Sequence, residues 1–277
     1  MAGLKEWARG KAWVALKRVT NAIKPALVMG QYEFINRLDR DDAQIRLMNY
    51  GFIDPNPASP AIPLAPDEEP DRCSLQLYHR VAGAVDLSGK EVLEVGCGRG
   101  GGAAYMLNRL GPKSVTGVDL CIGSIRFCRE QYPMDGLEFH KANAERLPFD
   151  DESFDAVVNI ESSHCYRKVG RFFAQVKRVL RPGGYFLYAD FRSNAEAELL
   201  RRELAASGLT LIEEENLNEG VLLALDHDDA RKREFIATKV PERRRAMFEF
   251  FAAVKGSGMY EAFRLGQGEY LRFVLRK

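Results

Sequence analysis

Short apolar runs alternate with amphipathic segments between residues 74 and 216. The short runs have the length and composition of buried strands, and the segments between them repeat apolar residues at helical spacing. Strands are predicted at residues 92–95, 114–118, 137–140, 154–160, 185–189 and 209–215, helices at 75–85, 101–110, 122–131, 168–180 and 194–207, and a turn at 181–184. This alternation predicts an α/β fold with a parallel sheet and right-handed crossovers.

The chain before residue 73 has a different pattern. Residues 31–50 are expected to form a helix that ends near Tyr50. Six of the twelve prolines follow, at positions 55, 57, 60, 63, 66 and 70. Proline fixes φ and removes a backbone donor, so this stretch predicts an extended connector. Residues 1–72 are therefore expected to be an N-terminal helical lid with a Pro-rich connector, and residues 73–277 the main domain.

The C-terminal part of the chain carries a helical insertion. Residues 217–266 have helical patterning that breaks at Pro241. The alternating segment 269–275 predicts one last strand. A helical insertion over residues 217–267, placed before that strand, would lie outside the sheet as a cap.

Composition and charge narrow the function classes. The chain has 277 residues, of which 46% are hydrophobic and 29% charged, as in an ordinary globular protein. Its net charge of +1 gives no field that would gather nucleic acid. No apolar stretch reaches about eighteen residues, so no transmembrane helix is expected. Five cysteines without a CxxC pair predict free thiols in a reducing cytosol, and hence a cytoplasmic protein.

The first thirty residues are locally basic, with six cations against one anion. They lack the uninterrupted apolar region of a signal peptide. The spacing predicts a helix of modest amphipathicity. Packing against the protein or a homo-oligomer contact is the favoured interpretation; peripheral contact with a membrane surface, or a cover over a lipophilic substrate, are the alternatives.

A glycine-rich loop is the first chemical signal. Residues 91–102 (EVLEVGCGRGGG) run from a buried strand into a loop that lets the backbone approach a ligand and begins a helix. Asp119 ends the next strand, where a carboxylate can accept hydrogen bonds from a ribose diol. These two features fit nicotinamide cofactors and S-adenosylmethionine equally, because both contain adenosine.

Three further segments distinguish between the two cofactors, because together with the glycine loop they resemble one enzyme family. Residues 141–149 (KANAERLPF) with 151–158 (DESFDAVV), and residues 178–184 (RVLRPGG), complete a set that resembles the class I S-adenosylmethionine-dependent methyltransferases. The resemblance implies a Rossmann-like seven-stranded sheet and S-adenosyl-L-methionine as cofactor. Closer still, LYHRVA, GRGGGA and ESSHCY, which begin at residues 77, 98 and 161, are similar to the phthiotriol/phenolphthiotriol dimycocerosate methyltransferases and related natural-product enzymes.

The resemblance assigns a set of residues to the cofactor. Glu94, Gly96, the Cys97 backbone and Gly98 would hold its methionine end, and the Asn159 backbone would face the amino-acid group. Asp119 would bind the ribose, and Leu120 would pack on adenine. Asn143 and Ala144 fall where relatives usually show Asp-Ala; the Asn143 amide oxygen can still accept from the adenine amino group, without the charge. Tyr50 is either an aromatic cap over the sulfonium or an ordinary packed tyrosine.

The catalytic candidates follow the fourth strand, at the mouth of an open α/β sheet. His164, with an ordinary pKa of about 6.5, would supply a neutral imidazole as general base. Glu161 would orient His164 or bind the cofactor through water. Substrate contacts are expected from Tyr166, Phe52 and His227, although His227 could instead belong to a solvated acidic turn. No metal is expected, because Glu161 and His164 alone do not make a site.

The leading hypothesis is therefore transfer of a methyl group to a hydroxyl of a lipophilic secondary metabolite or lipid. Relatives of this kind methylate a hydroxyl on a large lipophilic molecule. C-methylation of an alkene, terpenoid or sterol-like acceptor is the alternative, because sterol C-methyltransferases carry a similar acid-x-x-His segment. A non-catalytic binding module on the same scaffold is a third hypothesis. Nucleic-acid methylation is disfavoured by the neutral charge.

Overall fold

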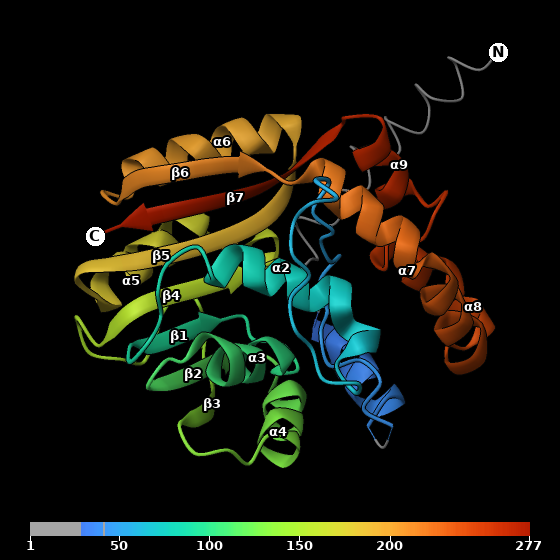
Figure 1. Cartoon of the computed structure of the whole chain (residues 1–277), viewed down its shortest axis with the longest axis horizontal. Helices are drawn as coiled ribbons and strands as arrows, with labels where there is room; N and C mark the ends of the chain where they lie inside the picture. The colour runs from blue at the N-terminus through green and yellow to red at the C-terminus, as the bar shows by residue number, and fades with distance from the viewer. Residues whose placement is uncertain (1–28, 41) are drawn as a thin grey trace.

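Seven strands form one mixed sheet in the order β3-β2-β1-β4-β5-β7-β6 (Figure 1). The computed structural model describes residues 29–40 and 42–277. The strands are β1 (Glu91–Val95), β2 (Ser114–Asp119), β3 (Leu137–Lys141), β4 (Phe154–Ile160), β5 (Leu180–Ser193), β6 (Thr210–Asn216) and β7 (Gly268–Arg276). Strands β1 to β5 are parallel, as predicted, but β7 runs antiparallel to both of its neighbours.

Helices cover both faces of the sheet because its central strands are apolar on both sides. Val92 and Val158 pack in one core with α2 (Arg72–Ala82), α3 (Gly101–Leu110) and α4 (Ile122–Gln131). Leu93 and Val157, each one residue along the same strands, pack in a second core on the opposite face, with α5 (Val169–Val179) and α6 (Asn194–Ala206). The fold is the three-layer α/β arrangement that the alternating pattern predicted.

The predicted helix over residues 31–50 is wrong in its second half. Residues 29–38 are helical, and the chain then turns. The Asp39 carboxylate accepts hydrogen bonds from the backbone N–H groups of Gln44 (3.0 Å) and Ile45 (2.8 Å), and Ala43 has a left-handed φ of 48°. These backbone groups therefore have partners outside a helix, and residues 43–50 form an irregular segment.

Two smaller predictions also need correction. Helix α2 begins at Arg72, earlier than expected, and ends at Ala82 before Gly83. The predicted turn at 181–184 lies inside β5 as an irregularity. There Leu180 pairs with Phe154 and Tyr185 pairs with Ala156, so the intervening residues bulge out of the ladder.

Three helices lie between β6 and β7, where the insertion was expected: α7 (Asn218–Lys239), α8 (Glu242–Phe251) and α9 (Gly258–Arg264). Pro241 is the N-cap of α8, at the predicted break. Figure 1 shows α7 and α8 beside the N-terminal segment, and contacts join the two: the Phe34 and Phe248 rings are 5.8 Å apart, and Arg244 lies 4.1 Å over Phe34. The N-terminal segment and the helical insertion therefore cover the same end of the sheet.

Some predictions are not tested by this fold. The basic segment lies outside the described residues except for Met29 and Gly30, so its packing, oligomer and membrane interpretations stay predictions. The domain boundary at residues 72 and 73 and the cytoplasmic location also stay predictions. In the part of the chain that the structure describes, no helix is both long and apolar enough to cross a bilayer. All five cysteines lie in this part, and none is bridged.

Candidate active site

Two adjoining cavities lie at the carboxyl ends of the parallel strands. The smaller, of about 180 Å³, is lined by residues that follow β1, β2, β3 and β4. The larger, of about 1370 Å³, lies between the N-terminal segment and the helices α7 and α8. Both cavities share one wall, made of Tyr32, Arg46, Leu47, Met48, Asn49, Glu161 and Cys165. Molecules bound in the two cavities would therefore lie next to each other, because the same residues line both.

The glycine loop is held tightly against β2. The backbone N–H groups of Gly96 and Cys97 both donate to the Val118 carbonyl, at 2.7 and 3.0 Å. Gly96 has a φ of 78°, and a Cβ there would lie 1.9 Å from Ser162 Oγ. Only glycine fits this position without a shift of its surroundings. Gly98, with a φ of 53°, lines the smaller cavity.

Asp119 is fixed by the same loop. Its two carboxylate oxygens accept the backbone N–H groups of Gly98 (3.1 Å) and Cys121 (2.8 Å). Burial raises the pKa of Asp119. A carboxylate offers about four acceptor positions, so these backbone contacts leave acceptor capacity for a ribose hydroxyl. The expected ribose contact thus lies in the smaller cavity.

Glu94 tests whether the site fits the amino-acid end of the cofactor. Tyr78 Oη donates to Glu94 Oε1 at 2.7 Å. The other oxygen, Oε2, is buried and has no hydrogen-bond partner among the described residues. Burial raises the pKa of Glu94 to about 7. A buried acceptor without a partner needs a donor, and an ammonium group could supply one. Glu94 itself lines neither cavity, so it lies behind the residues that line the smaller one.

The residues expected to bind adenine line the smaller cavity. Leu120 is 44% exposed, so an apolar surface is available to a flat base. Ala144 is buried beside it, and Asn143 lines the same wall. The Asn143 side-chain oxygen already accepts the Glu145 backbone N–H at 2.9 Å, which leaves it one further acceptor position.

Asn159 and Tyr166 differ from their expected roles. Asn159 is fully buried and lines neither cavity, and its side-chain amide donates to the Val95 carbonyl at 2.6 Å and to Tyr166 Oη at 3.1 Å. Tyr166, expected at the substrate, lines the smaller cavity instead. Its hydroxyl also meets Ser162 Oγ at 2.5 Å. Asn159 therefore positions Tyr166 at the cofactor side.

His164 lies on the short helix η2 (Ser163–Cys165) and lines the larger cavity. Its Nδ1 lies 2.8 Å from Asp190 Oδ1, and its backbone N–H donates to Asp190 Oδ2 at 2.9 Å. Asp190 is fully buried and pairs with Arg192 at 3.0 Å. Because Nδ1 is hydrogen-bonded to Asp190, Nε2 is the ring nitrogen of His164 that can exchange a proton with a substrate. No motif in the sequence pointed to Asp190, although it directly follows the predicted fifth strand.

The charge of Asp190 changes the expected state of His164. Burial alone would lower the pKa of the imidazole, but the neighbouring Cys165 and Asp190 outweigh it and raise the pKa to about 10. Asp190 itself has a lowered pKa, because Arg192 and His164 overcome the effect of its burial. The ordinary pKa assumed from the sequence is therefore wrong, and His164 carries a proton at neutral pH in the cofactor-free protein.

Glu161 holds the shared wall and does not orient His164. Its Oε1 accepts the backbone N–H of Tyr50 at 2.6 Å and the hydroxyl of Tyr270 at 2.8 Å. Burial raises its pKa to about 7. Its φ of 47° is left-handed, which costs energy in a residue with a Cβ. The contacts from Tyr50 and from Tyr270 in β7 keep Glu161 in this conformation. Asp190, and not Glu161, contacts the His164 ring and orients it.

Tyr50 lines the larger cavity and is absent from the lining of the smaller one. Its ring stacks on Phe191, with centroids 5.2 Å apart, and meets the edge of Phe263 at 5.8 Å. Phe52, expected at the substrate, lines neither cavity. It packs on α7, where a Cβ at Gly220 would lie 2.2 Å from its ring. Phe52 is thus a packing residue that fixes the connector.

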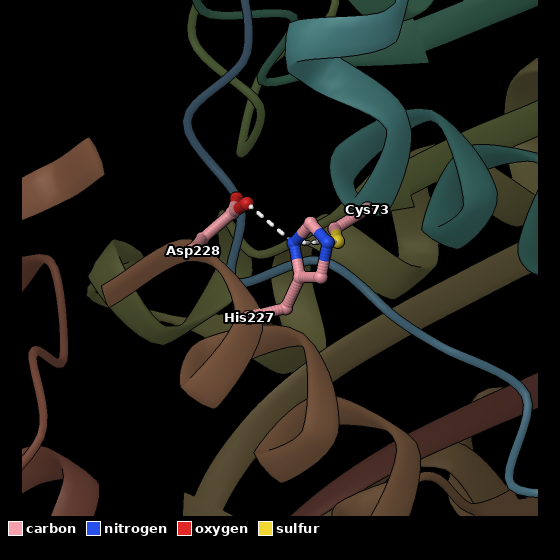
Figure 2. A group of neighbouring side chains, drawn as sticks. All are labelled: Cys73, His227 and Asp228. Atoms are coloured by element: carbon pink, nitrogen blue, oxygen red, sulfur yellow. Dashed lines mark hydrogen bonds and ion pairs between the residues drawn. The ribbon is translucent and has the colours of Figure 1, made fainter. Parts of the chain in front are cut away.

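His227 also lines neither cavity. It lies on α7 with 64% of its side chain exposed, and its Nδ1 is 3.6 Å from Cys73 Sγ and 3.2 Å from Asp228 Oδ1 (Figure 2). Three potential metal ligands therefore meet there. However, burial raises the pKa of Cys73 to about 12, and Arg231 pairs with Asp228 at 2.9 Å. A metal would have to displace both the thiol proton and this arginine.

Comparison with known proteins supports the same interpretation. A family model for a methyltransferase domain matches residues 93–188. The phthiotriol/phenolphthiotriol dimycocerosates methyltransferase of Mycobacterium tuberculosis is 40% identical over 84% of this chain and 86% of its own. The fatty-acid O-methyltransferase of Mycolicibacterium smegmatis is 37% identical over 89% of this chain and 88% of its own. A solved geranyl diphosphate C-methyltransferase from Streptomyces coelicolor matches with a TM-score of 0.61 at 21% identity, covering 87% of this chain and 92% of that one.

The strand order, the glycine loop after β1 and the acidic residue at the end of β2 define a class I methyltransferase, and the chain is an enzyme that uses S-adenosylmethionine as its cofactor. Within that class, it belongs to the family of the mycobacterial phthiotriol/phenolphthiotriol dimycocerosates methyltransferases. The family resemblance drawn from the sequence motifs is confirmed, and the hypothesis of a non-catalytic binding module is not supported.

Proposed function

We propose that this enzyme transfers a methyl group to a hydroxyl of a lipophilic small molecule, with His164 as general base. The observation that carries the proposal is the pairing of His164 with buried Asp190 on the wall of a large cavity. Much of that cavity is lined by apolar side chains, among them Ile35, Leu47, Phe235, Met247, Phe250 and Met259. A lipophilic acceptor would bury its surface there, with its oxygen directed to the imidazole.

The names of the relatives point in the same direction. One is named for phthiotriol and phenolphthiotriol dimycocerosates, and the other for fatty acids. Both relatives match most of this chain. An acceptor with a long apolar part is therefore the class that the proposal favours for this chain.

The residues of the smaller cavity would hold the cofactor. Asp119 would bind the ribose hydroxyls, and Leu120 and Ala144 would pack on the adenine. Glu94, which is buried and absent from the lining of that cavity, would accept from the ammonium group through its unpartnered Oε2. When bound, S-adenosylmethionine supplies an electrophilic methyl group on a positively charged sulfur. Glu161, on the wall between the cavities, would offset that positive charge when ionised.

His164 would then accept the hydroxyl proton at Nε2 as the acceptor oxygen attacks. Asp190 keeps the imidazole in one orientation and stabilises the imidazolium that forms. Because His164 begins protonated at neutral pH, it must first lose its proton to act as a base. The larger cavity aligns the acceptor with the methyl group and excludes water from the reacting atoms.

The test is methyl transfer from labelled cofactor to a panel of lipophilic alcohols, amines and alkenes. The wild-type protein should methylate alcohols, and His164→Gln should lower kcat by about 10²- to 10⁴-fold, the usual contribution of a general base. His140→Gln is a matched control, because His140 lies on β3 and pairs with exposed Glu138. Strict preference for amines, or full activity of His164→Gln on alcohols, would reject the hydroxyl assignment.

C-methylation is the second candidate, and the aromatic cluster on the larger cavity favours it. The ring centroids of Tyr50, Phe191 and Phe263 lie within 6.0 Å of one another, and Tyr50 and Phe191 line the larger cavity. Aromatic faces can stabilise the carbocation that forms when an alkene is methylated. In that case His164→Gln would leave alkene methylation largely intact and change the product distribution.

A further inference from the structure

A lysine ammonium lies unpaired on the wall of the larger cavity. Lys232 projects from α7, and its Nζ is buried without a hydrogen-bond partner among the described residues. Burial lowers the pKa of this amine. Taking an ammonium out of water without a counter-ion is strongly unfavourable, so folded proteins rarely keep one. Its position therefore needs an explanation that involves what enters the cavity.

Two carboxylates lie near Lys232, but both are committed elsewhere. Asp228, one helical turn earlier, pairs with Arg231 at 2.9 Å and with His227 at 3.2 Å. Glu161 accepts hydrogen bonds from the connector and from β7 through Oε1. Both carboxylates act on the pKa of Lys232 at a distance, and neither forms an ion pair with it. The ammonium is thus left with free donor positions.

The other basic side chains on this cavity differ from Lys232. Arg46 pairs with Asp71 at 2.9 Å, and Lys239 pairs with Asp42 at 2.5 Å. Arg231 and His164 pair with Asp228 and Asp190. Among the described side chains that line the larger cavity, Lys232 is the one cation without a carboxylate of the protein to balance it.

We propose that Lys232 binds a carboxylate of the substrate, so that the larger cavity takes lipophilic carboxylic acids. This inference rests on the proposed function in one respect: it takes the larger cavity as the one that binds the molecule to be methylated. A single ammonium balances a single carboxylate charge and can donate to both of its oxygens. A phosphate monoester carries up to two charges, and the described lining holds no second unpaired cation for it. The apolar remainder of the lining suits a hydrocarbon chain.

Calorimetric titration tests this with dodecanoate and its neutral counterpart dodecanol as probes. The wild-type protein should bind dodecanoate at least about tenfold more tightly than dodecanol, as expected for a charge-assisted hydrogen bond out of water. Lys232→Met, which keeps the length and removes the charge, should abolish that preference by weakening dodecanoate alone. Lys232→Arg, which keeps the charge, should retain the preference even if Lys232→Met is poorly folded.

Lys255→Met is the matched control. It removes the same charge from the same insertion, where Lys255 pairs with Asp226 at 3.0 Å outside the cavity lining, and should leave both affinities within about twofold. Equal wild-type affinity for the acid and the alcohol would overturn the proposal. So would an equal loss of both in Lys232→Met, or tighter Lys232-dependent binding of dodecyl phosphate than of dodecanoate.

Binding and methyl transfer are read out separately. A wild-type protein that binds dodecanoate through Lys232 but methylates no alcohol would support this inference and contradict the proposed function. A protein that methylates lipophilic alcohols but binds dodecanoate no better than dodecanol would do the reverse.

Discussion

At the residue scale, the imidazole of His164 depends on a carboxylate that is itself balanced by a cation. Asp190 receives hydrogen bonds from the ring and the backbone of His164, and its second oxygen pairs with Arg192. Arg192 therefore lets a carboxylate stay ionised without exposure to water. Cys165 and Asp190 together raise the pKa of His164 to about 10 against the effect of burial, which makes the residue a stronger base once it is deprotonated.

This arrangement predicts a pH dependence. Because the pKa of His164 is raised, its neutral form grows as the pH rises, so kcat/KM should climb between about pH 7 and about pH 10. Asp190→Asn removes one of the two neighbours that raise the pKa of His164, so the climb should level off at lower pH, while kcat on the plateau falls by about 10²-fold or more. The measurement is kcat/KM against pH for both proteins.

Asp151→Asn, at an exposed pair with Arg178, should leave the profile unchanged. A profile of Asp190→Asn that coincides with the wild type would contradict the role of Asp190 in setting the pKa of His164.

Gly96 gives a second prediction at this scale. Gly96→Ala places a Cβ against Ser162 at a left-handed φ, and the strain should lower the affinity for S-adenosylhomocysteine by about 5- to 100-fold. Gly89 has a similar φ of 70°, but a Cβ there meets nothing within 4 Å. Gly89→Ala should therefore cost about 1 kcal/mol of stability and leave the affinity unchanged. Equal affinity of the two variants in calorimetry would refute the role assigned to the loop.

At the scale of elements, the N-terminal segment is attached to the glycine loop itself. Arg99, within the loop, is fully buried and donates to the Asp39 carboxylate at 3.0 Å and to Asn36 Oδ1 at 2.9 Å. Its guanidinium lies 3.5 Å from the centre of the Phe127 ring in α4. The helical residues 29–38 are thereby held against the smaller cavity, where Met29 and Tyr32 form part of the lining.

Breaking this attachment should weaken cofactor binding and stability together. Asp39→Ala leaves the buried guanidinium unpaired, which should cost about 3–5 kcal/mol in the free energy of unfolding. Asp42→Ala removes an exposed partner of Lys239 nearby and should cost at most about 1 kcal/mol. Urea unfolding with and without S-adenosylhomocysteine measures both effects. Matching losses in the two variants would show that the buried pair does not hold the cover in place.

Helices and strands could be predicted where the pattern of neighbouring residues alone determines them. The strands that carry the cofactor site were found from short apolar runs, and their ends carry Asp119 and Asn143. The end of the helix at residue 38 was missed because the side chain of Asp39, rather than a breaker residue, redirects the backbone. The antiparallel direction of β7 was missed because an alternating pattern does not record the strand direction.

At the scale of the molecule, the acceptor side of the site is built by segments that lie far apart in the sequence. Gln31, in the N-terminal helix, donates to the Met247 sulfur at 2.7 Å, and both residues line the larger cavity. The cofactor half could be predicted because each contact belongs to a motif at a strand end. The acceptor half could not, because Asp190, Lys232 and the connector meet only after folding.

The most direct test of the account is a crystal structure of the full chain with S-adenosylhomocysteine and a hydroxylated lipid. The account predicts that the ribose hydroxyls bind Asp119 in the smaller cavity and that the sulfur lies at the wall shared with the larger cavity. The acceptor hydroxyl should lie within hydrogen-bond reach of His164 Nε2. Adenosine bound elsewhere, or an acceptor oxygen held away from His164, would contradict it.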